Sequence, residues 1–185
     1  MTSTVVFGAI ALVVLWAVVS YNTFIHLRNK SKEAWADITV QLKRRYDLIP
    51  NVVSVVKGYA AHEKETFEKV VLARNAAMGA SNLSDKGAAE GSLTGALKTV
   101  FALSENYPDL KANENFMALH KELTDTENKI EMSRRYYNGN VKNFNTAVAS
   151  FPGNLIAGAF NFKEMQFFTL EAGDEAANKP VEVKL

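Results

Sequence analysis

Residues 5–19 read VVFGAIALVVLWAVV, a run of apolar side chains that includes one glycine, Gly8. No Asp, Glu, Lys or Arg precedes Arg28. A helix from Thr4 to Ile25 would be about 33 Å long at ~1.5 Å per residue, enough to cross the ~30 Å hydrocarbon core of a bilayer. The stretch therefore predicts a transmembrane anchor over residues 1–27.

A cleaved signal peptide is the alternative reading of such a segment. Residues 1–4 (MTST) carry no positive side chain, and no clean small-x-small cleavage site follows the apolar run, so the anchor is favoured. Arg28, Lys30 and Lys32 come directly after the segment. The positive-inside bias then places the remainder of a single-pass protein on the cytoplasmic side.

The composition of the 185-residue chain argues against several classes of protein. Lys and Arg total 21 against 20 Asp and Glu, so there is no net field to attract nucleic acid, and we expect no nucleic-acid partner. Cysteine is absent, which excludes disulfides, thiolate metal sites and a cysteine nucleophile. Only four prolines and ten glycines occur, so helix is the expected structure over long stretches.

Apolar residues at helical spacing divide the remainder into four predicted helices, over residues 30–49, 51–80, 85–106 and 110–150. We expect a kink or short break at Ile49 and Pro50, because proline lacks an N–H and disfavours helix in the preceding residue. Short turns and one apolar stripe per helix favour an antiparallel bundle. The predicted fold is all-α: a membrane helix, a bundle of four-helix type over residues 28–150, an aromatic segment over 151–170 and a polar tail over 171–185.

Several charged side chains fall where the helical rhythm calls for apolar residues. They are Arg45, Glu63, Arg74, Glu127 and Arg134. Buried charges need partners, which predicts interhelical ion pairs such as Arg45 with Glu127 and Glu63 with Arg134. A structural role in fixing the register of the bundle is favoured over a functional pocket.

Two asparagines, Asn138 and Asn145, each follow an aromatic residue and lie seven positions apart, hence on one face of the last predicted helix. They could form hydrogen bonds across the bundle or to the backbone of a loop.

The predicted C-terminal segment is rich in phenylalanine but too short and too interrupted to cross a bilayer. Its five phenylalanines are Phe151, Phe160, Phe162, Phe167 and Phe168. The segment could fold over one end of the bundle and close the core. Alternatively, its aromatic rings could rest in the membrane interface or contact a neighbouring subunit.

No residue pattern indicates an enzyme, a cofactor or a metal site. His26, His62 and His120 fall on different predicted helices, and Thr66 stands where a zinc protease would need a second histidine after His62-Glu63. Neither a glycine-rich phosphate loop nor a Gly-x-Ser-x-Gly elbow occurs. A hydrolase would require Glu63, Glu127 and His120 to line one cavity that reaches solvent.

Several long stretches combine polar and apolar residues in a specific order. They are QLKRRYDLIPN at 41–51, VKGYA at 56–60, His62-Glu63, ENYPDLKAN at 105–113, Asn115-Phe116, LTDTEN at 123–128, Tyr137-Asn138, Phe144-Asn145 and Phe151-Pro152. Together they resemble the bacterial LemA family. The resemblance extends from Tyr21 to Phe168. It implies long antiparallel helices behind one helix in the bacterial inner membrane, with no established enzymatic activity and no cofactor residues. The family's name comes from a signalling context, and magnetosome relatives are linked to shaping internal membranes.

Two functions follow as hypotheses. In the first, the protein is a non-enzymatic scaffold that contacts membrane lipid, forms homo-oligomers and organises or shapes the membrane. In the second, it is an adaptor or sensor that binds another membrane protein, such as a protease or a signalling protein.

Overall fold

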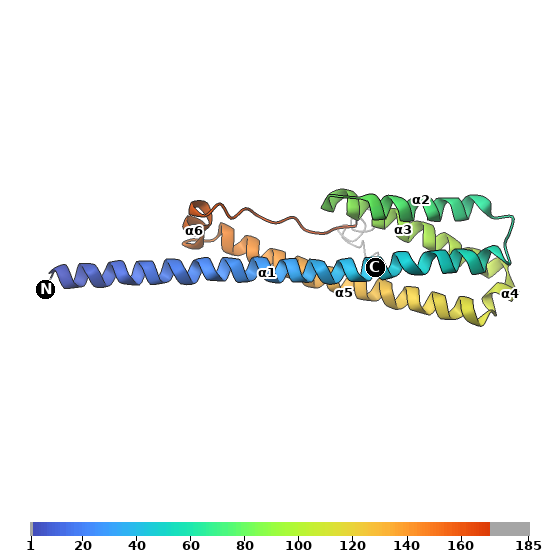
Figure 1. Cartoon of the computed structure of the whole chain (residues 1–185), viewed down its shortest axis with the longest axis horizontal. Coiled ribbons are helices and arrows are strands. Elements are labelled where there is room, and N and C mark those ends of the chain that lie inside the picture. The colour runs from blue at the N-terminus through green and yellow to red at the C-terminus, as the bar shows by residue number, and fades with distance from the viewer. Residues whose placement is uncertain (1, 171–185) are drawn as a thin grey trace, which may run out of the picture. The chain divides into compact units, whose positions relative to one another are not determined.

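The computed structural model describes residues 2–170, which form helices and contain no strand. The helices are α1 (Thr2–Lys57), α2 (Lys64–Gly79), α3 (Leu83–Leu103), α4 (Pro108–Lys111), α5 (Glu114–Ala149) and α6 (Gly153–Ala159), with a 3₁₀ turn at Ser104–Asn106 (Figure 1). The all-α prediction is confirmed. The described chain forms two compact units: the anchor unit, residues 2–37 and 133–167, and the bundle unit, residues 38–132 and 168–170. The predicted polar tail, residues 171–185, lies outside the described residues.

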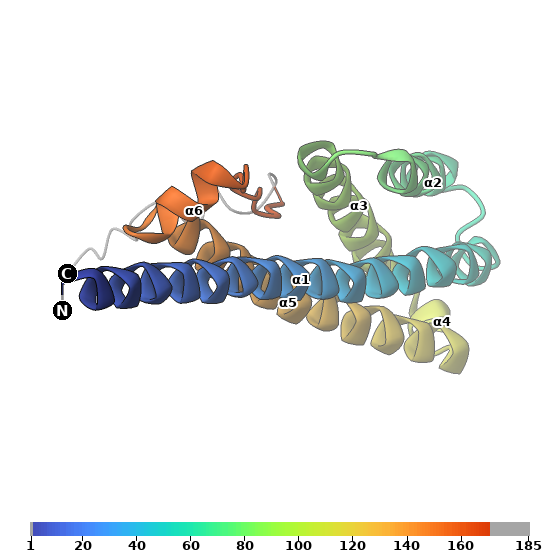
Figure 2. The ribbon, with the colours of Figure 1, turned by 60° about the vertical axis from the view of Figure 1, so that its left-hand side comes forward.

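The bundle unit is an antiparallel bundle of four helical segments. The C-terminal part of α1, then α2, α3 and the N-terminal part of α5 alternate in direction (Figure 1; Figure 2 shows the same segments from another side). One apolar stripe from each segment fills the core. Its fully or nearly fully buried side chains include Ile38, Leu42, Ile49, Val52, Val56, Phe67, Val70, Leu93, Leu97, Val100, Phe116, Leu123 and Ile130.

The break expected at Ile49 and Pro50 is wrong, because α1 continues through Pro50 to Lys57. Pro50 itself is exposed, while Ile49 and Val52 on either side of it are almost completely buried. Burial of this apolar stripe offsets the ~3 kcal/mol that proline costs inside a helix. The first turn out of the helix is therefore at residues 58–63, where the chain reverses into α2.

The last predicted helix, residues 110–150, begins later in the structure than expected. Pro108 starts the four-residue α4, and α5 begins only at Glu114. The Asn113 side chain accepts a hydrogen bond from the Phe116 N–H at 3.0 Å, which caps the start of α5. Asn82 caps α3 in the same way, through the Asp85 N–H at 2.8 Å.

The anchor unit combines the N-terminal part of α1, the C-terminal part of α5, α6 and an extended segment that follows α6. Its core cluster consists of Phe24 from α1, Phe144 from α5, and Ile156 and Ala157 from α6. The first part of α1, in contrast, has no protein cover: residues 2–16 are exposed on all sides. Within residues 2–170, α1 is the one helix long and apolar enough to cross a membrane, and its most apolar window is entirely unburied.

Candidate functional site

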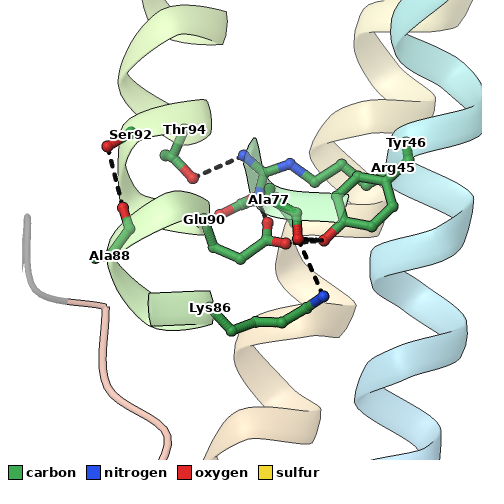
Figure 3. Close-up of polar contacts among 9 residues, drawn as sticks. Arg45, Tyr46, Ala77, Lys86, Ala88, Glu90, Ser92 and Thr94 are labelled. Carbon is green, nitrogen blue, oxygen red and sulfur yellow. Dashed lines mark hydrogen bonds and ion pairs between the residues drawn. The ribbon is translucent and has the colours of Figure 1, made fainter. Parts of the chain in front are cut away.

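The most concentrated polar chemistry in the bundle unit is a buried group of side chains around Arg45, which we call the Arg45 cluster: Arg45, Tyr46, Glu90, Thr94 and Glu127. Arg45 Nη1 lies 3.4 Å from Glu90 Oε2 and 3.1 Å from Glu127 Oε2. Arg45 Nη2 donates a hydrogen bond to Thr94 Oγ1 at 2.7 Å, and the Tyr46 hydroxyl donates one to Glu90 Oε1 (Figure 3). Helices α1, α3 and α5 thus meet at one guanidinium group.

Arg45 and Glu90 each occupy a core position of their helix. Arg45 lies between Leu42 and Ile49 in the buried stripe of α1, and Glu90 precedes Leu93 by three residues on α3. Arg45 and Glu90 are both only 1% exposed, whereas the Glu127 side chain is 40% exposed. Burial of Arg45 and Glu90 therefore places full charges where the sequence pattern calls for apolar side chains.

Burial sets the proton affinities within the cluster. Desolvation raises the pKa of the Glu90 carboxyl above its ordinary value, although the Tyr46 hydrogen bond and the charge of Arg45 both act to lower it. Burial, together with the hydrogen bond to Glu90, raises the pKa of Tyr46 far above the usual tyrosine value. Tyr46 therefore keeps its proton and remains a donor to Glu90.

The predicted ion-pair residues have different surroundings in the structure. Arg45 and Glu127, which the sequence analysis paired, lie at ion-pair distance. Glu90, the most buried carboxylate of the cluster, was not predicted, although its position three residues before Leu93 was a usable signal. Glu63 is the residue before the first turn of α2, in the bundle unit, whereas Arg134 belongs to α5 in the anchor unit.

Among the described residues, Arg74 replaces a missing backbone donor. In a regular helix the N–H of residue 50 would donate to the carbonyl of Tyr46, and Pro50 has no N–H. The Arg74 side chain on α2 donates from Nε to this carbonyl oxygen at 2.8 Å. The contact explains how α1 passes through Pro50 without leaving a carbonyl of the bundle core unsatisfied.

We expect Arg74→Met to lower the free energy of unfolding by about 1 to 3 kcal/mol, because the Tyr46 carbonyl loses its partner. In the background of Pro50→Ala, which restores the N–H, the same change should cost less than about 0.5 kcal/mol. Urea unfolding of the four proteins of this cycle, followed by circular dichroism, measures both values. Equal costs in the two backgrounds would show that Arg74 acts independently of Pro50.

The two asparagines that the sequence places on one helix face, Asn138 and Asn145, lie on α5 in the anchor unit. Asn145 Oδ1 accepts from the Met165 N–H at 2.8 Å, and its Nδ2 donates to the Met165 carbonyl at 2.9 Å. The Tyr137 hydroxyl adds a hydrogen bond to the Gln166 carbonyl at 2.9 Å. Asn145 thus fixes the extended segment to α5 through its backbone; Asn138 lies half-buried on the same helix.

The five phenylalanines of the C-terminal segment divide into buried and exposed residues. Phe162 stacks on Phe24, with ring centroids 5.0 Å apart. Phe168 is fully buried in the bundle unit, where its neighbour Thr169 approaches Gly87 so closely that a Cβ would not fit. The others are exposed: Phe151 by 79%, Phe160 by 57% and Phe167 by 48%. Part of the segment therefore closes a core, and part of it leaves apolar surface uncovered.

A small groove of about 170 Å³ next to the Arg45 cluster includes both His120 and Glu127 in its lining. Glu63 does not line it, and the His120 ring packs on Phe101 with centroids 4.3 Å apart. Both Nη atoms of Arg45 already have partners: Nη1 contacts Glu90 and Glu127, and Nη2 donates to Thr94. In the part of the chain that the structure describes, no group of three or more His, Cys, Asp or Glu residues is placed to hold a metal ion. The geometry thus suits a structural linkage between helices better than a reaction centre.

Comparison with known proteins places this arrangement in a family. The LemA family model matches residues 34–185, which include every member of the Arg45 cluster. The chain is 24% identical over 174 residues to the magnetosome protein MamQ of Magnetospirillum gryphiswaldense, covering 80% of this chain and 64% of that protein. It is likewise 24% identical over 181 residues to the magnetosome protein MamQ 2 of Paramagnetospirillum magneticum, covering 83% and 66%.

Protein LemA of Metamycoplasma hominis is 26% identical over 151 residues, which cover 80% of this chain and 68% of that protein. The chain therefore spans somewhat less than two thirds of the length of the magnetosome relatives. Since the family match extends over most of the sequence, the protein belongs to the LemA family.

Proposed function

We propose that this protein is a non-enzymatic, membrane-anchored helical scaffold that self-associates and organises or shapes the bacterial inner membrane. The observation that carries the proposal is the composition of α1. Its first part is apolar and without protein cover, and its last part supplies core side chains of the bundle, within one uninterrupted helix. Basic residues that follow the apolar part favour a cytoplasmic bundle. A protein built in this way places a folded unit at a membrane without a loop between anchor and bundle.

Surface chemistry and relatives support the assembling role. Helix α2 exposes Leu72 by 68% and Met78 by 50%, and exposed apolar side chains of this size are used in contacts between subunits. Two of the relatives are named magnetosome proteins, which supports a role connected with a membrane. Neither the family nor the names of these relatives denote an enzymatic activity.

The mass of the full-length protein in mild detergent and in nanodiscs tests self-association. Light scattering should give species larger than a monomer, and Leu72→Lys should shift them toward monomer because a charge on α2 opposes an apolar contact. Lys43→Glu is the matched control, since Lys43 is exposed on α1 and pairs only locally with Asp47 at 2.7 Å. If the protein is strictly monomeric at membrane-like concentration, the scaffold proposal is wrong.

A second function, an adaptor for another membrane protein, is favoured by an open groove of about 670 Å³ at one end of α2. Phe67, Val71 and Leu72 supply its apolar part, and Lys57, Lys64 and Glu68 its charged rim. An apolar floor with a charged rim is the usual anatomy of a protein-binding surface. Because the chain contains no cysteine, Leu72→Cys provides a unique cross-linking site in cells. Cross-links only to copies of the same chain would favour the scaffold; a different membrane protein trapped at Leu72 and not at Lys43→Cys would favour the adaptor.

A further inference from the structure

The anchor unit contains a second long stretch without a charged side chain. Residues 143–162 read NFNTAVASFPGNLIAGAFNF and lie between Lys142 and Lys163. They comprise the end of α5, the turn, α6 and the first residues after it. We call this stretch the uncharged hairpin. Like the part of α1 before Arg28 it carries no charged side chain, but it is shorter and contains four asparagines, and the two stretches are more than a hundred residues apart in the sequence.

The structure packs the uncharged hairpin against the end of the apolar part of α1. Phe144, Ile156 and Ala157 form one cluster with Phe24, and Ala17 and Tyr21 pack against it. The Phe160 ring lies 4.8 Å from the Tyr21 ring, centroid to centroid. In Figure 1, α6 lies beside α1 within the anchor unit, at the point where α1 loses its protein cover.

The level of α6 along α1 places it within the apolar layer. Counting back from Arg28, a hydrocarbon core of ~30 Å needs about 20 residues of helix, which extends to about Gly8. Ala17 and Tyr21 fall inside this span, and Val18 and Val19 beside them are more than half exposed. From Tyr21 to Arg28 the helix rises about 10 Å, which equals the ~5 to 10 Å depth at which interfacial helices are inserted. The Phe160 end of α6, which contacts Tyr21, would thus lie at the depth of the interfacial layer.

The first charged residues after the apolar part of α1 and after the uncharged hairpin lie close to each other. The Arg28 guanidinium lies 5.6 Å from the centre of the Phe162 ring, and Lys163 follows Phe162 directly. Basic side chains that end apolar segments are typical of the headgroup region, where their charges reach water and phosphate. The uncharged hairpin and the anchor therefore leave the apolar layer together.

The exposed surface and the backbone of the hairpin both suit a lipid environment. Phe151, Leu155 and Phe160 are exposed by 79%, 60% and 57%. Several backbone donors at the turns are satisfied internally, as a membrane favours: the Asn154 N–H by the Ser150 carbonyl at 2.8 Å and the Phe162 N–H by the Ala157 carbonyl at 2.9 Å. Asn154 and Asn161 are exposed as well, which limits the insertion to the interfacial layer.

From these observations we infer that the uncharged hairpin is a second membrane contact, in which Phe151, Leu155 and Phe160 insert into the interfacial layer of the leaflet that α1 leaves. The inference rests on the proposed anchoring of α1. It gives the protein a wedge in one leaflet beside its single helix, a geometry that expands that leaflet relative to the other.

Single-cysteine variants of the full-length protein in vesicles of phosphatidylethanolamine and phosphatidylglycerol test the inference. The natural absence of cysteine makes every label site-specific. Bimane is attached at Leu155→Cys or Phe160→Cys, and at Val40→Cys in the bundle part of α1 as the matched control, whose side chain is exposed by 63%. Quenching by a lipid with a nitroxide near the headgroup should be roughly fivefold stronger at positions 155 and 160 than at position 40, with iodide giving the reverse order.

Leu12→Cys separates failure of the inference from failure of the anchor, because Leu12 lies in the apolar part of α1 that no protein covers. Lipid quenching at position 12 together with iodide quenching at 155 and 160 would overturn the inference and leave the anchor intact. Iodide access at position 12 would overturn both. Protection of positions 155 and 160 from both quenchers would mean that protein covers them, which also overturns the lipid contact.

Discussion

Arg45→Met is expected to lower the free energy of unfolding by about 3 to 5 kcal/mol, because it leaves the Glu90 carboxylate buried without its cation. Glu90 is only 1% exposed and cannot recover water, whereas the more exposed Glu127 side chain can. The effect is measurable by urea unfolding of the full-length protein in detergent, followed by circular dichroism at pH 7.5. Within residues 2–170 the buried Arg45 Nε has no hydrogen-bond partner, so the loss of stability should not reach the upper end of this range.

The cost of Arg45→Met should depend on pH. Burial raises the folded-state pKa of Glu90 above its unfolded value of about 4.3, and the charge of Arg45 opposes that rise. Removing Arg45 therefore raises the folded pKa further. A carboxyl with a raised folded pKa binds its proton more tightly in the native state, so stability falls as pH rises from the unfolded pKa through the folded one. The penalty should consequently be smaller at pH 5 than at pH 7.5.

Arg44→Met serves as the matched control for Arg45→Met. Arg44 is the preceding residue on α1 and pairs with Glu122, but the side chains of this pair are 44% and 38% exposed. Such a pair contributes about 0 to 1 kcal/mol because water screens it. The double variant Arg45→Met, Glu90→Met should regain most of the lost stability, since no buried charge remains between these two positions. Equal costs for the two arginine variants would contradict a special role for the buried cluster.

The sequence predicted the helical class and the apolar stripes because both are local properties of the chain. It predicted the position of the first break wrongly. Proline at position 50 is a strong local signal for a break, but burial of Ile49 and Val52 and the Arg74 donor to the Tyr46 carbonyl arise only after α2 has packed. Tertiary contacts thus override a local preference whose cost is only ~3 kcal/mol.

The polar cluster was predictable in part. Arg45 and Glu127 stand out because both interrupt apolar stripes, and the structure places them 3.1 Å apart. Glu90 interrupts the stripe of α3 in the same way but lies near its start, among small residues such as Gly87 and Ala88, where the apolar rhythm is weak. The role of Tyr46 was not predictable, since a sequence does not show that its hydroxyl faces a buried carboxylate.

The phenylalanines of the C-terminal segment required the structure for a different reason. Sequence alone left open whether the segment closes a core or contacts lipid, and the structure divides the residues between buried and exposed positions. Phe162 is packed against Phe24 and Phe144, whereas Phe151 and Phe160 remain exposed. Spacing in the segment follows neither helix nor strand over its whole length, so no periodicity could have assigned each ring to a side.

Phe144→Ala is the second change with a large expected effect, a loss of about 3 to 5 kcal/mol of stability in the anchor unit. Phe144 is only 1% exposed and meets Phe24 and Phe162 edge to face, each at 6.3 Å between ring centroids. Alanine would leave a cavity where α1, α5 and the residues after α6 converge. Hydrogen exchange of the α6 amides should accelerate by roughly 100- to 4,000-fold, because each tenfold corresponds to ~1.4 kcal/mol of local opening.

Phe167→Ala removes the same atoms from a position that is 48% exposed and is the control for Phe144→Ala. It should cost less than about 1 kcal/mol and leave exchange in α6 nearly unchanged. Exchange in α2 and α3 should stay unchanged in both variants, because those helices belong to the bundle unit. If Phe144→Ala accelerated exchange in α2 and α3 as much as in α6, the two units would unfold as one cooperative body. If it left α6 protected, the phenylalanine cluster would not be what holds α6 against α1.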